Sequence, residues 1–199
     1  MRNRIYRITV CAMCAALYFV LACFVSVRAG NLRVTFASLP ILICAALYGP
    51  GWAAGSAALG EFLNQMLSYG LMPTTAMWMI PPVVRALLMG LWCVGLSRRG
   101  VRGNQTVRSV RVFEKRTAKG IHPEDYLTAF LVFTVITAVF TTLLNTLVMY
   151  LDAMILGYSA AYVAADFLPR ILSGVVTAVI CGIVAPPVLK ALRKVVPAK

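Results

Sequence analysis

The sequence contains few charged residues, and very few of these are acidic. Asp, Glu, Lys and Arg make up 13% of the 199 residues, and only six residues are Asp or Glu. A soluble domain of this size usually carries about 25% charged residues. Hydrophobic residues reach 61%, and the mean hydropathy is +0.84. This composition excludes an ordinary soluble domain and predicts an integral membrane protein.

Residues and motifs that support catalysis are also scarce. The only histidine, His122, falls in a polar stretch, so no apolar run offers a histidine base to the weak serine motif at Gly55-Ser56. The chain has no glycine-rich phosphate loop, so it does not power transport itself. Cys11 and Cys14 have the spacing of a metal or redox pair, but no second Cys/His pair accompanies them. The sequence predicts no catalytic residue, no metal and no cofactor.

Apolar runs, separated by charged residues and by Gly and Pro, predict the fold. They indicate an all-α integral membrane protein, a compact bundle of six transmembrane helices forming one domain over residues 1–199. The second run is short and contains Pro40, so we expect it to be irregular or to extend into the preceding loop. The expected spans are about 8–27, 34–48, 52–69, 75–96, 126–151 and 167–192, with a basic loop at 97–125.

The distribution of Lys and Arg predicts the orientation. Fifteen of the 19 basic residues lie in the N-terminal segment, the central loop and the C-terminal segment, whereas Arg28, Arg33 and Arg170 lie in the opposite loops. Lys and Arg concentrate in cytoplasmic loops, so both termini are expected in the cytoplasm. The basic loop is then expected to contact anionic lipid headgroups, with a dedicated partner site as the alternative. Clustering beside the spans argues against nucleic-acid binding.

Polar residues inside the spans are candidates for a binding site, because a charge within a bilayer usually faces a cavity or a partner. Glu61 and Asn64 are three residues apart, hence on one helical face, and Arg85 interrupts the fourth span. We expect these residues and the aromatic side chains near them to form an outward-facing pocket for a small polar molecule. The alternative is internal pairing, for instance of Arg85 with Glu61. The candidate substrate-binding residues are Arg28, Arg33, Glu61, Asn64, Tyr69, Trp78, Arg85, Asn145 and Arg170.

A pair of small residues on the first span is a candidate contact with another protein. Ala12 and Ala16 are four residues apart on one face, and such faces let a second helix approach closely. Pairs of this kind also arise by chance in alanine-rich helices.

Several passages together resemble the substrate-binding S component of energy-coupling factor (ECF) vitamin transporters, and the folate-type branch in particular. The stretch LRVTFASLP, running on to LYGP, is similar to a passage that leads through the family's second span. Three departures stand out: Glu61 replaces the usual Asp, Ala86 replaces the usual glycine, and the shortened Pro73-Thr74-Thr75 lacks the family's glycine and phenylalanine. The matching passages, within 12–189, are Leu32–Pro40, Leu47–Pro50, Gly60–Leu63, Pro73–Thr75, Arg85–Leu87, Leu144–Leu147 and Leu168–Arg170.

The resemblance implies a partner-dependent function in the bacterial plasma membrane. S components bind a vitamin with high affinity in an outward-facing pocket capped by the loop after the first span. They dock on a transmembrane T subunit, which couples to two cytoplasmic ATPase subunits, and they topple in the membrane to release the vitamin. Ala12 and Ala16 would form the docking surface, and Arg28 and Arg33 in the capping loop could meet a carboxylate.

The leading hypothesis is therefore a non-enzymatic vitamin-binding subunit of an ECF importer, with folate as a candidate ligand. Pantothenate, a thiamin precursor, a queuosine precursor or another small metabolite remain alternatives. A small intramembrane enzyme using Glu61 and Arg85 is a further alternative.

Overall fold

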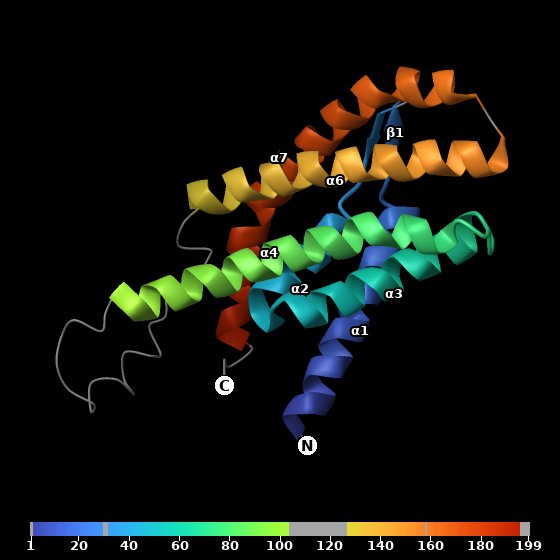
Figure 1. Ribbon diagram of the computed structural model, residues 1–199. Helices are drawn as coiled ribbons and strands as arrows, with labels where there is room; N and C mark the ends of the chain where they lie inside the picture. Colours follow the sequence, from blue (N-terminus) through green and yellow to red (C-terminus); the bar gives the residue numbers. More distant parts are fainter. Residues whose placement is uncertain (1, 30–31, 104–126, 158, 196–199) are drawn as a thin grey trace, which may run out of the picture.

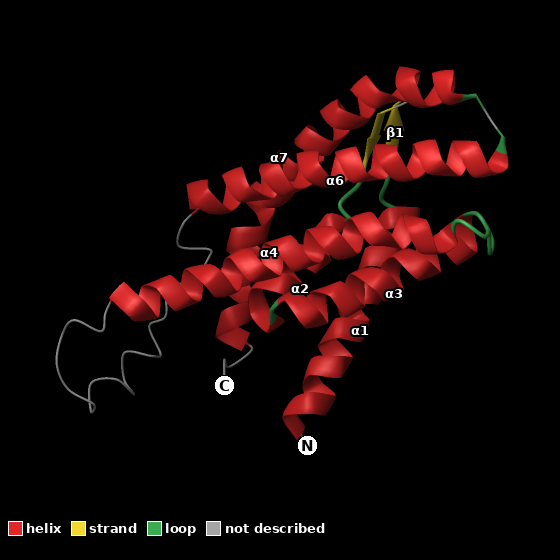
Figure 2. Ribbon diagram, in the orientation of Figure 1, coloured by secondary structure: helices red, strands yellow, loops and turns green. Residues whose placement is uncertain are grey.

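The structure is a computed structural model, and it describes residues 2–29, 32–103, 127–157 and 159–195. Within these residues the chain forms six helices and one short β-hairpin (Figures 1 and 2). The predicted all-α bundle of six helices is thus present, and the short β-hairpin that accompanies it was not predicted. The elements are α1 (Arg2–Cys23), β1 (Val27–Ala29), β2 (Leu32–Val34), α2 (Ser38–Tyr48), α3 (Pro50–Ser68), α4 (Thr75–Gly103), α6 (Leu127–Leu156) and α7 (Ala160–Val195).

The β-hairpin changes the predicted ends of the first two spans. Strands β1 and β2 are antiparallel, with Arg28 opposite Arg33, so the first helix ends at Cys23 and the second begins only at Ser38. Val27 and Val34 are β-branched and favour an extended backbone. β2 packs against α7, so the hairpin connects the first part of the chain to the last helix.

A glycine–proline turn fixes the angle between α2 and α3. Gly49 adopts a φ of 84°, which residues with a side chain rarely adopt, and its N–H donates to the carbonyl of Ala45. Pro50 opens α3, where its missing N–H costs no helical hydrogen bond. α4 approaches this turn closely, because a Cβ on Gly90 would lie 2.4 Å from the Cα of Pro50. Both glycines and the proline are therefore required by the local geometry.

Three helices are long and apolar enough to cross a membrane, as judged by length and composition over the described residues: Thr75–Gly95, Leu127–Leu156 and Val163–Leu192. α2 has 11 residues and is about 16 Å long, roughly half of a bilayer core. Arg7–Cys23 is likewise a shorter apolar helix. The six predicted runs correspond to six helices, but three of them meet the criterion for a span.

The orientation in the membrane, and the side on which the termini lie, stay predictions. In Figure 1 the start of α1 and the end of α7 both lie at the lower edge, and the turns after α3 and α6 lie at the right. α7 changes direction along its length, and it contains Pro169, Pro186 and Pro187, each of which removes a helical hydrogen bond. Most of the predicted basic loop, and His122 within it, lies outside the described residues.

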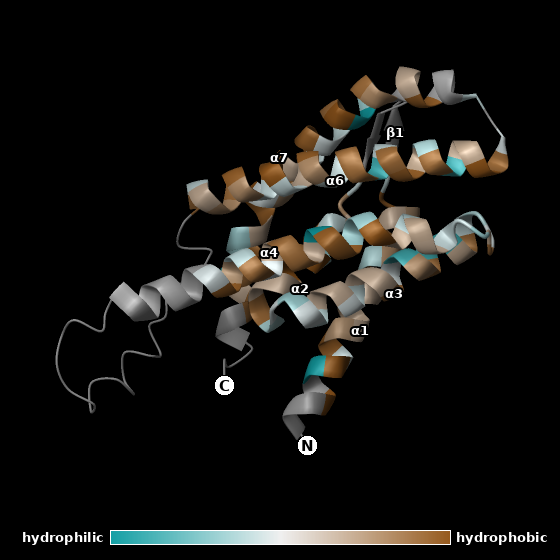
Figure 3. Cartoon of the chain, viewed as in Figure 1, coloured by the Kyte–Doolittle hydropathy of each residue, from teal (hydrophilic) through white to brown (hydrophobic). Residues whose placement is uncertain are grey.

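The core is built from small residues that let helices pack closely. Ala53, Ala57 and Cys44 are fully buried between α2 and α3, and Met89 and Phe130 bring α4 and α6 to the same cluster. Hydrophobic residues dominate most of the helices (Figure 3), and many large apolar side chains are exposed, whereas polar ones such as Glu61, Asn64 and Thr134 are buried. This reverses the pattern of a soluble protein and places the polar residues where a cavity forms.

Candidate binding site

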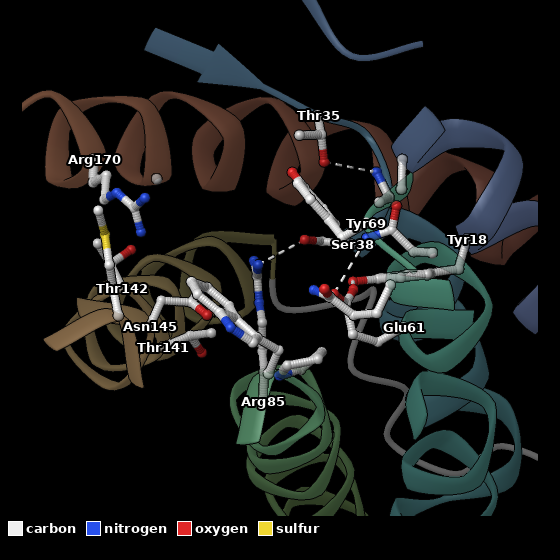
Figure 4. A pocket seen from close by; sticks show the side chains of 18 of the residues that line it. Tyr18, Thr35, Ser38, Glu61, Tyr69, Arg85, Thr141, Thr142, Asn145 and Arg170 are labelled. Atoms are coloured by element: carbon white, nitrogen blue, oxygen red, sulfur yellow. Dashed lines mark hydrogen bonds between the residues drawn. The ribbon is translucent and has the colours of Figure 1, made fainter. Parts of the chain in front are cut away.

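One cavity of about 610 Å³ lies between all six described helices, within the range of about 300–1,000 Å³ typical of small-molecule sites. Its walls combine four charged residues with hydroxyl, amide, aromatic and apolar side chains (Figure 4). The lining residues are Tyr18, Ala22, Thr35, Ala37, Ser38, Ile41, Glu61, Asn64, Gln65, Tyr69, Gly70, Met72, Thr74, Thr75, Trp78, Pro82, Arg85, Ala138, Thr141, Thr142, Asn145, Met149, Asp152, Leu156, Arg170, Ser173, Gly174 and Thr177.

The cavity brings together seven of the nine residues predicted as substrate-binding. They come from α3, the turn after it, α4, α6 and α7: Glu61, Asn64, Tyr69, Trp78, Arg85, Asn145 and Arg170. The other two, Arg28 and Arg33, lie opposite each other in the hairpin, and their side chains are outside the described set. Whether any of the nine binds a ligand stays a prediction.

The carboxylate of Glu61 is fully engaged by the chain itself. The hydroxyl of Tyr18 donates to Oε2 at 2.5 Å, and Asn64 Nδ2 and Gln65 Nε2 donate to Oε1 at 3.2 and 2.7 Å. Glu61, Asn64 and Gln65 follow one another along α3, whereas Tyr18 comes from α1. Three side-chain donors from two helices therefore surround this buried carboxylate.

The sequence reasoning missed Tyr18, the residue that joins this network to α1. A glycine makes the contact possible, because a Cβ on Gly60 would lie 2.7 Å from Cδ1 of the Tyr18 ring. The sequence holds a weak signal for this contact, since a glycine next to a buried acid on a helix often marks a close approach.

Arg85 makes a single hydrogen bond, although it lies in the same cavity. Its Nη1 donates to the hydroxyl of Ser38 at 2.7 Å, while its Nε and Nη2 are buried and have no partner among the described residues. The internal pairing of Arg85 with Glu61, considered as an alternative above, is therefore wrong. Ser38, the first residue of α2, was not among the predicted site residues.

The opposite wall is formed by α6 and α7 and is rich in hydroxyl groups. Thr141 and Thr142 donate to backbone carbonyls one turn earlier, at 2.6 and 2.9 Å, so their oxygens are free to accept hydrogen bonds from the cavity side. Gly174 leaves room for this arrangement, because a Cβ there would lie 2.6 Å from Thr142 Oγ1. Asn145 and Arg170 also face the cavity from this wall (Figure 4).

The open side of the cavity lies at the turn between α3 and α4. Tyr69 and Met72 are 52% and 47% exposed there, and Trp78 lines the wall one turn further along. The turn is ordered by the N–H of Met72, which donates to Thr75 Oγ1 at 3.0 Å. Aromatic and thioether side chains at an entrance can pack against a flat ring system.

Two further expectations concern residues away from the cavity. Ser56 is buried and donates to the carbonyl of Cys11 at 3.0 Å, so it is held in the core rather than presented to a substrate. Cys11 and Cys14 are free thiols, packed near Cys44. Over the described residues, no three His, Cys, Asp or Glu side chains are grouped so as to hold a metal ion.

The small-residue pair of α1 faces outward. Ala12 and Ala16 are exposed, on the same side as Met13 and Leu17, which are 59% and 51% exposed. Cys14, Ala15 and Tyr18 pack inward against the rest of the bundle. One face of α1 is therefore available to lipid or to another helix.

The fold and the site together define a membrane-embedded protein with a cavity for a small molecule. The chain matches the family model described as "ECF transporter, substrate-specific component" over residues 6–189, and it belongs to that family. Its members are transporter subunits rather than enzymes, and they work with the T and ATPase module of ECF transporters. No curated protein matches the sequence.

Solved structures show the same fold at low sequence identity. ThiT from Listeria monocytogenes is 18% identical, with a TM-score of 0.61, over 96% of this chain and 97% of ThiT. The S component of a bacterial ECF transporter is 16% identical, with a TM-score of 0.60, over 98% of both chains. At these identities the likeness concerns the fold alone, and it does not identify the substrate.

Proposed function

We propose that this chain is the high-affinity vitamin-binding subunit of an ECF importer in the bacterial plasma membrane, with folate as the first candidate ligand. The observation that carries the proposal is the cavity of about 610 Å³, in which charged and amide side chains face aromatic ones. Such a lining suits a molecule with both a ring system and polar groups. The passages that resemble the folate-type branch also supply Glu61, Arg85, Asn145 and Arg170 to the walls.

The proposal includes an orientation and a docking surface. The cavity opens outward, both termini lie in the cytoplasm, and the hairpin with Arg28 and Arg33 caps the entrance. The exposed face of α1 around Ala12 and Ala16 contacts the T subunit, which couples to two ATPase subunits. Close helix approach at small residues is a common mode of association in membranes.

The direct test identifies what the purified chain binds. Mass spectrometry of small molecules retained through purification, followed by calorimetry with folate, pantothenate, a thiamin precursor and a queuosine precursor, should reveal one ligand. Uptake of that compound into vesicles should require ATP, the T subunit and both ATPases. Failure to bind any compound together with failure to co-purify a T subunit would contradict the proposal.

Docking is tested separately from binding. Ala16→Leu adds bulk to the exposed face of α1, so it should abolish co-purification with the T subunit while calorimetric binding by the isolated chain persists. Met13→Leu, a substitution of similar volume on the same exposed face, is the matched control. Unchanged co-purification of Ala16→Leu with the T subunit would contradict the assigned role.

The enzyme alternative predicts a different outcome for one substitution. Glu61→Gln should weaken or preserve binding in a binding subunit, whereas an enzyme that uses Glu61 as an acid or base would lose turnover entirely. Chemical change of the retained compound by the wild-type chain, abolished in Glu61→Gln, would favour the enzyme.

A further inference from the structure

The guanidinium of Arg85 has hydrogen-bond donors that the chain leaves unused. It projects from α4 into the cavity (Figure 4), and one N–H of Nη1 donates to the hydroxyl of Ser38. Its Nε and Nη2 are both buried without a partner in the described part of the chain. Buried polar groups are nearly always hydrogen-bonded, and buried charges are nearly always paired. A cationic group in this condition calls for an acceptor that the chain does not supply.

The two unused nitrogens lie on the same edge of the guanidinium plane. Nε–H and Nη2–H point in parallel from that edge, and their spacing matches the two oxygens of a carboxylate. Ser38 accepts from Nη1 at the other end of the group, so this hydrogen bond does not occupy that edge. The edge is therefore prepared for a bidentate contact, a geometry that lysine cannot reproduce.

The nearby carboxylate of Glu61 does not meet this need. Its oxygens already accept from Tyr18, Asn64 and Gln65. Glu61 thus already has three donors, and the other two charged residues of the walls, Asp152 and Arg170, carry opposite charges. The unused donors on Arg85 therefore favour an anionic ligand.

We propose that Arg85 binds a carboxylate of the transported compound through Nε–H and Nη2–H, so that the cargo is an organic acid rather than a cation or a neutral molecule. This inference rests on the proposed function and specifies its substrate class. A carboxylate supplies both the missing acceptors and the missing negative charge, whereas a neutral group with one acceptor leaves a donor and the charge uncompensated. Because both nitrogens are buried in this structure, a carboxylate reaches them only when the atoms that cover them shift.

Matched pairs of compounds test the charge requirement. Calorimetry on the purified full chain compares folate with its diamide, pantothenate with pantothenol, and nicotinate with nicotinamide. At least one acid should bind about 100-fold more tightly than its neutral partner, as expected for a buried bidentate charge pair. Equal affinity for an acid and its neutral partner, or binding of neutral or cationic compounds only, would overturn the inference while leaving the proposed function intact.

Substitutions test whether Arg85 is the group responsible. Arg85→Met should reduce the preference for the acid to less than about tenfold, and Arg85→Lys should recover only part of it, because an ammonium cannot form the fork. Arg7→Met, at an exposed position on α1, is the matched control and should keep the full preference. An unchanged preference in Arg85→Met would overturn the assignment.

Thermal unfolding separates ligand recognition from a structural role. Arg85→Met removes a buried cation with unused donors, so with no compound added it should unfold at the same or a higher temperature than the wild-type chain. If Arg85 were needed for the stability of the fold, Arg85→Met would instead unfold at a clearly lower temperature than the wild-type chain. Absence of binding by every compound, together with absence of docking to a T subunit, would instead contradict the proposed function itself.

Discussion

Glu61 and Arg85 are opposite charges in the walls of one cavity, and the chain treats them differently. Three side-chain donors surround the carboxylate of Glu61, whereas the guanidinium of Arg85 makes one hydrogen bond among the described residues, to Ser38. An engaged charge contributes to the stability of the bundle, and an unengaged one reduces it. Glu61 therefore links α1 to α3 through Tyr18, whereas Arg85 has the unused donors on which the proposed ligand contact rests.

The largest effect is expected from removing the carboxylate. Glu61→Leu leaves the donors of Tyr18, Asn64 and Gln65 without their acceptor, so we expect a loss of about 3 kcal/mol in the free energy of unfolding. The measurement is denaturant unfolding in detergent. Arg85→Met, which removes the positively charged residue of the pair, is the matched variant. Equal losses of unfolding free energy in the two variants would contradict the claim that Glu61 stabilises the bundle and Arg85 does not.

A smaller effect should follow from crowding the contact of Tyr18 with α3. Gly60→Ala places a methyl group 2.7 Å from the Tyr18 ring, so the ring must move away from Glu61 at a cost of about 2 kcal/mol. Gly55→Ala is the control on the same helix, since a Cβ there meets no atom within 4 Å. If the two alanines have the same effect on unfolding, the contact does not support the network.

Removing one donor should cost less than removing the acceptor. Tyr18→Phe deletes the hydroxyl that donates to Oε2 at 2.5 Å, while the two amides still engage Oε1, so we expect a loss of about 1–2 kcal/mol in the free energy of unfolding. Tyr69→Phe, at a position that is 52% exposed, should change stability by less than about 0.5 kcal/mol. A larger loss in Tyr69→Phe than in Tyr18→Phe would contradict the assignment.

The smallest effect is expected on the Arg85 side. Ser38→Ala removes the single hydrogen bond to Nη1 and should lower the free energy of unfolding by less than about 1 kcal/mol. Because Nε and Nη2 of Arg85 remain, the affinity of Ser38→Ala for an acid, measured by calorimetry, should fall by less than about tenfold relative to the wild-type chain. A loss of affinity as large as in Arg85→Met would mean that Ser38, rather than the fork, decides recognition.

Much of the architecture was accessible from sequence because its signals are local. Apolar runs and the breaks at Gly49-Pro50 and after Tyr69 gave six helices, and seven of nine predicted residues line the cavity. The hairpin was missed because Arg28 and Arg33 were read as part of a loop, although Val27 and Val34 favour strands. Each of its strands has three residues, too few for an alternating pattern to stand out.

The sequence by itself determined that the chain resides in a membrane and where its helices break, because hydropathy and the conformational limits of glycine and proline act over a few residues. Only the tertiary structure decided which side chains form hydrogen bonds with Glu61 and with Arg85. Tyr18 lies 43 residues before Glu61, and Ser38 lies 47 residues before Arg85. Pairing at such separations follows from how α1, α2, α3 and α4 pack. The sequence therefore left an Arg85–Glu61 pair open as an alternative, whereas in the fold each of the two residues has its own hydrogen-bond partners.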